Sequence, residues 1–314
     1  MLAHEANDQL FRLTNALLAD TRSRVYLHLD AKLLDLGWTE HHGDPRLVVL
    51  PHRTAVNWGG YSVVEATLLL LRRALMDSSN GQFVLLSGSC FPLMPTGRLN
   101  DRILSLDVPS VSIWGKIDSA LSDGEGLGRF VVTKFHLHDR AILTPKTSRM
   151  HERVWGLYKR LNGRLPYERK VDISDLWKGS QFFIVNRRLA EICSNPPANL
   201  VKALRYALAP DEILFSTLIV RDLNNNGASI SLTNPEEMRQ GSHFIIKRTP
   251  HERGLREKLF QQVDLRRLNV SDADAAVESG ALFARKCSAE VSQTIAGRWT
   301  GTDVVEVYPE ASAA

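Results

Sequence analysis

Three small residues follow a short, uninterrupted apolar stretch of the chain. Phe83 to Leu86 are apolar without interruption and lead into Ser87-Gly88-Ser89, after which Pro92 and Pro95 predict the end of the β-ladder. Such a stretch is typical of a central parallel strand buried on both faces. Ligands of open α/β sheets lie beyond the carboxyl ends of these strands, where small residues let them approach the backbone. Ser87, Gly88 and Ser89 are therefore candidates for the floor of a binding site, with a plain exit from strand to loop as the alternative.

Charged side chains at three other places are able to do chemistry. Asp30 ends a second apolar strand pattern, and an aspartate there either binds a ligand or forms a turn. Pro210-Asp211-Glu212 opens a helix pattern; on spacing alone, the acidic residues there stabilise the helix start. Arg285 and Lys286 form a basic pair that is able to bind an anion, although such pairs are usually solvated.

Strand and helix patterns alternate over the first 96 residues. A helix with Leu10, Leu13 and Leu17 on one face is expected to start at Asn7 or Asp8. A second helix is expected to start with a capping box formed by Ser62 and Glu65. The strands are expected at residues 1–4, 25–30, 46–51 and 83–86. This alternation predicts a Rossmann-like half with right-handed crossovers.

Beyond residue 96 the patterns predict a mixed α/β region. Helices are expected near residues 99–106, 150–161, 189–193, 200–208 and 213–219, and strands near 111–114, 130–137 and 182–186. His136 and His138 would share one face of the strand at 130–137, but no third metal ligand accompanies them. Residues 235–262 give no clear pattern.

Composition indicates an ordinary globular protein. The chain has 314 residues, 44% of them apolar and 24% charged, with a net charge of +4. This small excess does not indicate nucleic acid as a partner, and no apolar stretch approaches the roughly 20 residues that cross a bilayer. The three cysteines are far apart, which favours a reducing compartment. Polar residues near the N-terminus argue against a secretory signal. The first strand pattern looks clipped, as if Met1 were an internal start.

Seven motifs in one order resemble the core-2/I-branching N-acetylglucosaminyltransferase and peptide xylosyltransferase family. They are Leu2–His4, Val25–Asp30 with Lys32, Trp58–Gly60, Ser87–Leu93, Gly179–Phe183 with Asn186–Arg188, Pro210–Glu212 and Leu282–Lys286. The resemblance implies a bacterial member with a GT-A-type α/β fold. It implies one glycosyltransferase domain over 1–290, with a nucleotide-binding half (1–96), an acceptor and catalytic half (97–290), and a C-terminal extension (291–314).

The resemblance also assigns roles to residues. It implies that Glu212 is the catalytic base, which reverses the preference for a helix-stabilising role, and that Asp30 and His4 contact the uracil of a UDP-sugar. Arg285 and Lys286 would hold the diphosphate without a metal, with Arg267 as a further contact. The remaining donor-site residues would be Trp58, for which packing in the core is the alternative, and Ser87, Gly88 and Ser89; Gly179, Ser180 and Gln181 would line the sugar pocket.

Two features bear on the chemistry that the resemblance implies. Asp272-Ala-Asp274 spells the Asp-x-Asp string of metal-dependent glycosyltransferases, but it lies at an expected helix start rather than at the end of a central strand, so we do not expect a metal site. Cys90 stands where many relatives carry aspartate, which leaves the identity of the donor open.

The expected activity is inverting transfer of a sugar from UDP to a saccharide hydroxyl. N-acetylglucosamine is favoured, with xylose and glucuronate as alternatives, and a non-catalytic module that binds nucleotide sugars is the rival. No cofactor or nucleic acid is expected. The acceptor would be a saccharide or a glycolipid, and the location the cytoplasm or a peripheral site at the inner membrane.

Overall fold

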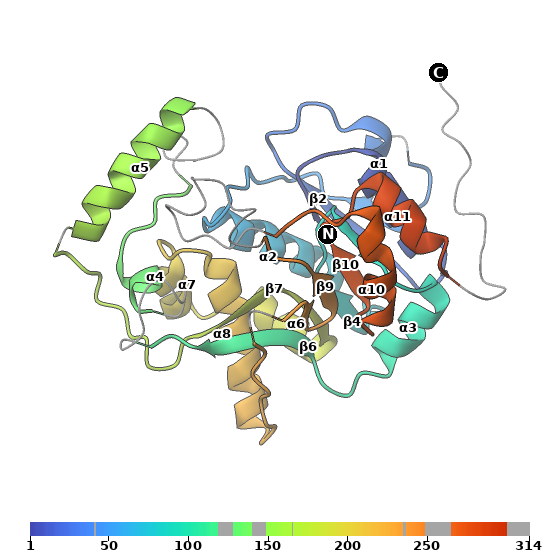
Figure 1. Ribbon diagram of the computed structural model, residues 1–314. Helices are drawn as coiled ribbons and strands as arrows, with labels where there is room; N and C mark the ends of the chain where they lie inside the picture. The colour runs from blue at the N-terminus through green and yellow to red at the C-terminus, as the bar shows by residue number, and fades with distance from the viewer. Residues whose placement is uncertain are drawn as a thin grey trace.

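The computed structural model describes residues 1–40, 42–118, 128–139, 149–164, 166–234, 237–248 and 265–299. This part of the chain forms a mixed α/β structure in which helices cover the strands (Figure 1). None of its helices has the combination of length and hydropathy that a bilayer crossing requires.

Six strands form the central layer. β1 (Leu2–Ala3), β2 (Val25–Leu29) and β3 (Leu47–Val49) pair in parallel in the order β1-β2-β3. On its other side β1 meets the continuation of β4 (Gln82–Val84), where Leu2 pairs with Ser87 in parallel. β4 then pairs with β7 (Trp177–Asn186), and β7 with β6 (Ser110–Lys116), both antiparallel. The spatial order is therefore β3-β2-β1-β4-β7-β6, and the expected strand at 83–86 lies near its centre.

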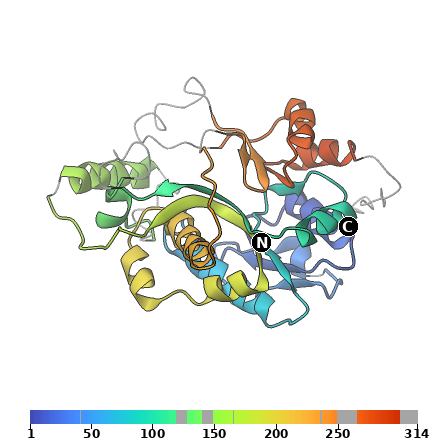
Figure 2. The ribbon, with the colours of Figure 1, turned by 90° about the horizontal axis from the view of Figure 1, so that it is seen from below.

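Apolar side chains form one core on each face of this layer. One core joins α1 (Asp8–Leu18), α3 (Thr96–Leu104) and α11 (Ala289–Ala296) to the sheet. The other joins α2 (Ser62–Leu75), α6 (Arg187–Ser194), α7 (Ala198–Leu204) and α8 (Pro210–Asn225). Figure 2 shows α8 beneath the curved strands β6 and β7.

A second, smaller sheet carries the basic pair. Its order is β5 (Cys90–Pro92), β10 (Phe283–Arg285), β9 (His243–Ile245) and β8 (Arg239–Gln240). The prediction that the prolines end the ladder is wrong for Pro92, because the chain resumes pairing directly after Ser89. Pro92 is tolerated there since β5 is an edge strand.

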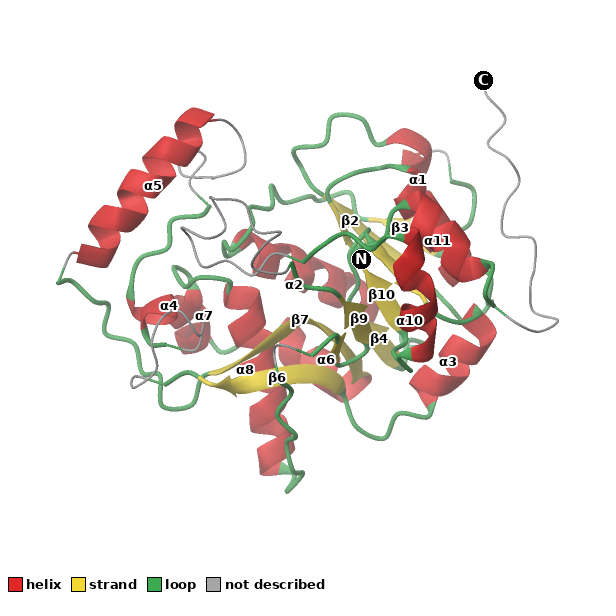
Figure 3. Ribbon diagram, viewed as in Figure 1, coloured by secondary structure: helices red, strands yellow, loops and turns green. Residues whose placement is uncertain are grey.

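The remaining elements lie around these sheets. They are η1 (Gly37–Glu40), α4 (Phe130–Thr133), α5 (Arg149–Arg164), η4 (Val270–Asp272) and α10 (Ala273–Glu278). α10 and α11 lie beside one another, and α11 packs on α1 (Figure 3). The boundary predicted at residue 290 falls inside α11, whose Val291 and Ile295 are part of the core.

Two local predictions were wrong, and one was right. Residues 130–133 are helical rather than extended, so His136 and His138 lie in a loop. α2 starts at Ser62 without the expected capping box. The carboxylate of Asp139 accepts hydrogen bonds from the backbone N–H (3.1 Å) and hydroxyl (2.5 Å) of Ser62 instead. Asn7 caps α1 as predicted, since its side-chain oxygen accepts from the N–H of Leu10 at 3.1 Å.

Candidate active site

The carboxyl ends of β2, β1 and β4 lie next to one another along one edge of the sheet, which we call the carboxyl edge. It brings Asp30, His4 and Ser87 to Ser89 onto adjacent strand ends. The close approach of this turn to β1 explains why residue 88 is a glycine. A Cβ atom on Gly88 would lie 3.2 Å from the Cβ of Ala3, so a side chain there would push against β1.

Arg285 of the small sheet reaches this edge. Its Nε donates a hydrogen bond to Oγ of Ser87 at 3.2 Å, and its guanidinium carbon lies 4.4 Å from the ring centroid of Phe182. The hydroxyl oxygens of Ser87 and Ser89 are 3.1 Å apart. The fold thus brings the guanidinium of Arg285 next to the hydroxyls of Ser87 and Ser89, although these predicted residues are almost 200 positions apart in sequence.

Lys286 directly follows β10 of the small sheet, and Arg267 lies between β9 and β10. The ammonium of Lys286 donates to the backbone carbonyl of Leu265 at 3.3 Å, and the N–H of Cys287 donates to the carbonyl of Ser89 at 2.8 Å. The residue after Lys286 is therefore bonded to Ser89, while the side chain of Lys286 contacts Leu265 and that of Arg267 is exposed.

Glu212 lies in the first turn of α8. This helix begins after Ala209, whose left-handed backbone (φ 48°) turns the chain into Pro210. The side chain of Glu212 is 28% exposed, and its Oε2 lies 3.4 Å from the ammonium of Lys178, which is only 9% exposed. Glu212 is thus paired with the shielded ammonium of Lys178 and is also accessible to solvent.

The neighbouring carboxylate occupies a different environment. Asp211 is buried, and this burial, followed by the charge of Glu212, raises the pKa of Asp211 to about 7. Asp211 therefore holds a proton more readily than an ordinary aspartate does. Of the two acids, only Glu212 is accessible enough to receive a proton from a bound molecule.

β7 links the acidic and the basic groups. Lys178, beside Glu212, and Phe182, beneath Arg285, are four residues apart on this strand, so their Cα atoms are at most about 14 Å apart. Relative to β6, β7 contains two extra residues between Gly179 and Phe183, and this bulge includes Ser180 and Gln181. Bulges re-aim side chains and are common beside active sites.

Three other predicted residues lie at the carboxyl edge or near it. Asp30 is buried, accepts from the N–H of Lys32 at 2.9 Å and lies 3.3 Å from its ammonium, so it forms the turn that was the alternative reading. His4 is exposed and lies 3.7 Å from Glu5. Trp58 is 46% exposed, with its ring edge-on to His138 at 6.0 Å, so it is not a core residue.

Burial makes the layer beneath Ser87 uncharged. Sγ of Cys90 lies 3.4 Å from Oγ of Ser87 and 3.6 Å from Nε2 of His243. Burial raises the pKa of the Cys90 thiol, and burial together with the charge of Arg285 lowers the pKa of His243 to about 3. A neutral thiol therefore rests on a neutral imidazole beneath Ser87.

The two carboxylates of the Asp-x-Asp string are both bound by arginines. Arg266 contacts Asp272 through two hydrogen bonds of 2.9 Å, and Nε of Arg298 donates to Asp274 at 2.7 Å. The string lies at the start of α10, as expected, and no cluster of metal ligands occurs among the described residues.

Sequence reasoning missed Lys178, Asp139 and His243. Lys178 directly precedes Gly179-Ser180, so its position before a predicted site was a signal that was available. Asp139 and His243 contact Ser62 and Cys90 across long separations in sequence, and His243 lies in the range without a clear pattern. A cavity of about 370 Å³ lies at the opposite edge of the sheet and contains none of the predicted site residues.

The comparisons with known proteins bear on the first third of the chain. A family model described as Core-2/I-Branching enzyme matches residues 2–111, while a search of curated proteins gives no match. The matched range includes Asp30, Trp58 and Ser87 to Ser89, and ends before Glu212 and Arg285. The match implies glycosyltransferase activity. Over residues 2–111 it confirms the resemblance that the motifs indicated, so this part of the chain is similar to the Core-2/I-Branching enzyme family.

Proposed function

We propose that this protein is an inverting glycosyltransferase that moves a sugar from a UDP-sugar to a saccharide hydroxyl, with Glu212 as the general base. N-acetylglucosamine is the favoured sugar, and the acceptor is a saccharide or glycolipid presented to a protein in the cytoplasm or at the inner membrane. The observation that carries the proposal is the placement of Glu212 and Arg285 beside two residues of one strand, Lys178 and Phe182 of β7.

The proposed reaction is a single displacement. The acceptor hydroxyl gives its proton to the carboxylate of Glu212 while its oxygen forms a bond to the anomeric carbon. The bond from that carbon to the diphosphate breaks on the opposite face, which inverts the configuration, and the electron pair leaves with UDP. One carboxylate suffices, because the leaving group is already a stable anion.

Positive charge must receive the departing diphosphate. Arg285 offers a forked guanidinium, held by Ser87 and stacked on Phe182, and Lys286 offers a point charge on the adjacent turn. In this proposal the two adjacent residues engage the same anion. In this proposal the two cations fulfil the role that a metal ion has in other glycosyltransferases.

The Cys90 environment guides the choice of donor. A neutral thiol cannot accept hydrogen bonds from sugar hydroxyls as a carboxylate does. UDP-xylose and UDP-glucuronate therefore remain alternatives to UDP-N-acetylglucosamine, and a donor screen distinguishes them.

Replacement of Glu212 by glutamine tests the proposed base. Glu212→Gln keeps the shape of the side chain but accepts no proton, so we expect the rate of transfer to fall by about 10²–10⁴-fold while the affinity for UDP stays within a factor of about two. Glu191→Gln, on the exposed surface of α6, is the matched control and should retain full activity. Equal transfer by Glu212→Gln and the wild type would remove Glu212 from the mechanism. UDP binding without transfer by the wild type would favour the non-catalytic module.

A further inference from the structure

The helix α5 lies at the margin of the molecule, away from both sheets. Figure 1 shows it beyond α4 and α7, and the second view in Figure 2 also shows it at the margin. Its 16 residues give a length of about 24 Å at a rise of 1.5 Å per residue. A helix in this position can present a long face to solvent.

The inner face of α5 is bound to the loop that follows α4. The hydroxyl of Tyr158 and the side-chain amide of Asn162 both donate to the backbone carbonyl of Phe135, the amide at 2.9 Å. These two side chains are half-buried and lie one turn apart, so they belong to one face of the helix. The two hydrogen bonds therefore fix which face of α5 is turned toward the body of the protein.

The outer face of α5 combines apolar and basic side chains. Leu157 and Leu161, one turn apart, are 56% and 52% exposed. Arg153 and Arg160 are exposed as well, four residues before and three residues after Leu157. Residues at these spacings are neighbours on the surface of a helix, so the leucines and the arginines share one face. We call Arg153, Leu157, Arg160 and Leu161 the outer face of α5.

The net positive charge of the chain is concentrated in this helix. α5 contains five basic residues and one acidic residue, so its formal charge is +4. The net charge of the whole chain is also +4, so basic and acidic residues balance over the rest of the sequence. The attraction of this protein for an anionic surface would therefore be strongest at α5.

A lipid surface with negative charge matches this face better than a protein partner does. Helices that place basic residues beside apolar ones lie in the headgroup region of a membrane, with the apolar side chains inserted. The forked guanidinium of arginine also matches the oxygens of a phosphate. A stable protein interface uses about 20–30 residues on each side, and one face of a helix of 16 residues offers far fewer.

The loop beneath α5 leads to the carboxyl edge of the central sheet. Phe135, which accepts the bonds from α5, and His138 are three residues apart, so their Cα atoms are at most about 11 Å apart. The ring centroid of His138 lies 6.0 Å from that of Trp58, and Asp139 accepts a hydrogen bond from Ser62. Five consecutive residues thus connect α5 to the edge that holds the candidate active site.

We propose that the outer face of α5 binds the surface of a membrane that contains anionic phospholipids. Leu157 and Leu161 enter the headgroup region, while Arg153 and Arg160 bind the lipid phosphates. For the acceptor, this inference rests on the proposed function. It narrows the acceptor to a glycolipid, because the saccharide of a glycolipid is presented at the same surface that α5 binds.

Vesicle flotation of the full chain tests the membrane contact. In about 0.1 M salt, we expect the wild type to bind phosphatidylcholine vesicles with about 30% phosphatidylglycerol at least about tenfold more tightly than pure phosphatidylcholine vesicles. Leu157→Gln combined with Arg160→Gln should lose about tenfold of that affinity, since glutamine keeps the helix but removes the apolar group and the charge. The matched control makes the same two changes on α3, Leu104→Gln with Arg102→Gln, where both side chains are exposed, and should bind as the wild type does.

Several results would overturn the proposal. Equal binding by the α5 variant and the wild type would place the contact elsewhere on the molecule. Binding to neither kind of vesicle, or equal binding to both, would exclude anionic lipid as the partner and leave the outer face to a protein.

A salt titration of the wild type needs no substitution. Raising the salt to about 0.5 M should release most of the protein from the anionic vesicles, and binding that does not change with salt would contradict the role of the arginines. Neither measurement depends on the donor site. UDP binding by the wild type and the α5 variant, which should be equal, tests the proposed function separately.

Discussion

Asp211 and Glu212 are adjacent in sequence, and the fold gives them opposite properties. Glu212 is paired with Lys178 and open to solvent, while Asp211 is buried against the core with a raised pKa. Spacing alone gave both residues the same role at a helix start. The difference arises from which side of the first turn of α8 faces β7, and side-chain burial of this kind depends on tertiary packing.

Replacement of Asp211 should make stability less dependent on pH. The folded-state pKa of about 7 lies above the ordinary value of 3.8, so the folded protein binds more protons between these values than the unfolded chain. Asp211 therefore costs no stability below about pH 4 and an increasing amount as the pH rises to 7. We expect Asp211→Asn to match the wild type at pH 4.5 within about 1 kcal/mol and to exceed it by about 2–4 kcal/mol at pH 7.5.

Urea unfolding at the two pH values measures this difference. Asp107→Asn, at an exposed turn, is the control and should change neither value. An Asp211→Asn variant that is destabilised at pH 7.5 would show that the charged carboxylate contributes favourable contacts.

Arg285 should not be replaceable by lysine. Lysine keeps the charge but loses the fork and the stacking on Phe182, so one hydrogen bond to a charged oxygen is lost. Such a bond contributes roughly 1.5–3 kcal/mol, so we expect Arg285→Lys to weaken UDP binding by about 10–100-fold in calorimetry. Arg298→Lys, in the exposed pair with Asp274, makes the same change and should bind UDP normally. Unchanged affinity in Arg285→Lys would exclude a forked contact with the diphosphate.

At the scale of elements, the bulge of β7 positions the site. A Cβ atom on Gly179 would lie 2.0 Å from the carbonyl oxygen of Ser112 and 2.8 Å from Oγ of Ser216. Glycine at this position therefore lets β7 contact β6 and α8 at once, and this contact fixes Lys178 against Glu212. The bulge therefore links the packing of β7 against β6 and α8 to the position of Lys178 beside Glu212.

Gly179→Ala should damage the fold and the site together. The new methyl group meets backbone rather than a movable side chain, so we expect a loss of about 1–3 kcal/mol in urea unfolding and reduced transfer. A Cβ on Gly81 meets nothing within 4 Å, and Gly81→Ala is the matched control, with little effect on either. Full stability of Gly179→Ala would mean that β7 has room to move away from β6.

The order of elements was largely predictable from sequence, because apolar periodicity and caps are local signals. The strand at Val25–Leu29, the helix capped by Asn7 and the strand that precedes Ser87 follow from it. The capping box at Ser62 failed because its real partner, Asp139, is 77 residues away. The small sheet was not foreseen, because its strands are two or three residues long and distant in sequence.

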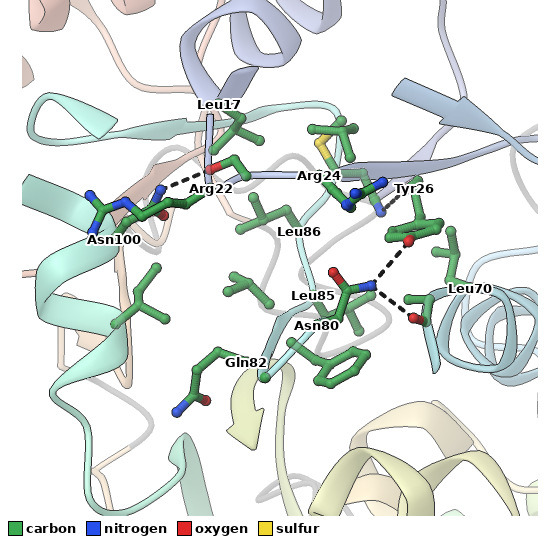
Figure 4. A pocket seen from close by; sticks show the side chains of 18 of the residues that line it. Leu17, Arg22, Arg24, Tyr26, Leu70, Asn80, Gln82, Leu85, Leu86 and Asn100 are labelled. Carbon is green, nitrogen blue, oxygen red and sulfur yellow. Dashed lines mark hydrogen bonds between the residues drawn. The ribbon is translucent and has the colours of Figure 1, made fainter. Parts of the chain in front are cut away.

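At the scale of the molecule, the two edges of the central sheet differ in what they hold. The carboxyl edge gathers Ser87, Arg285 and the strand ends that we propose as the donor site, and the amino edge holds the cavity beside Met1 (Figure 4). Short β1 belongs to both, since Ala3 accepts from Asp30 at one end and Met1 borders the cavity at the other.

A donor screen tests the carboxyl edge as a whole. A ligand present at 100 times its Kd stabilises the folded state by about 2.7 kcal/mol, which for a domain of this size raises Tm by roughly 5 °C. We expect UDP and one UDP-sugar among those of N-acetylglucosamine, xylose and glucuronate to give such a shift. Since the cationic partner of the diphosphate is proposed to be Arg285 with Lys286, neither the shift nor transfer should change with EDTA. If EDTA abolished transfer and manganese restored it, a metal ion rather than Arg285 and Lys286 would be the cationic partner of the diphosphate. If no uridine nucleotide raised Tm, the donor site would not lie at this edge of the sheet.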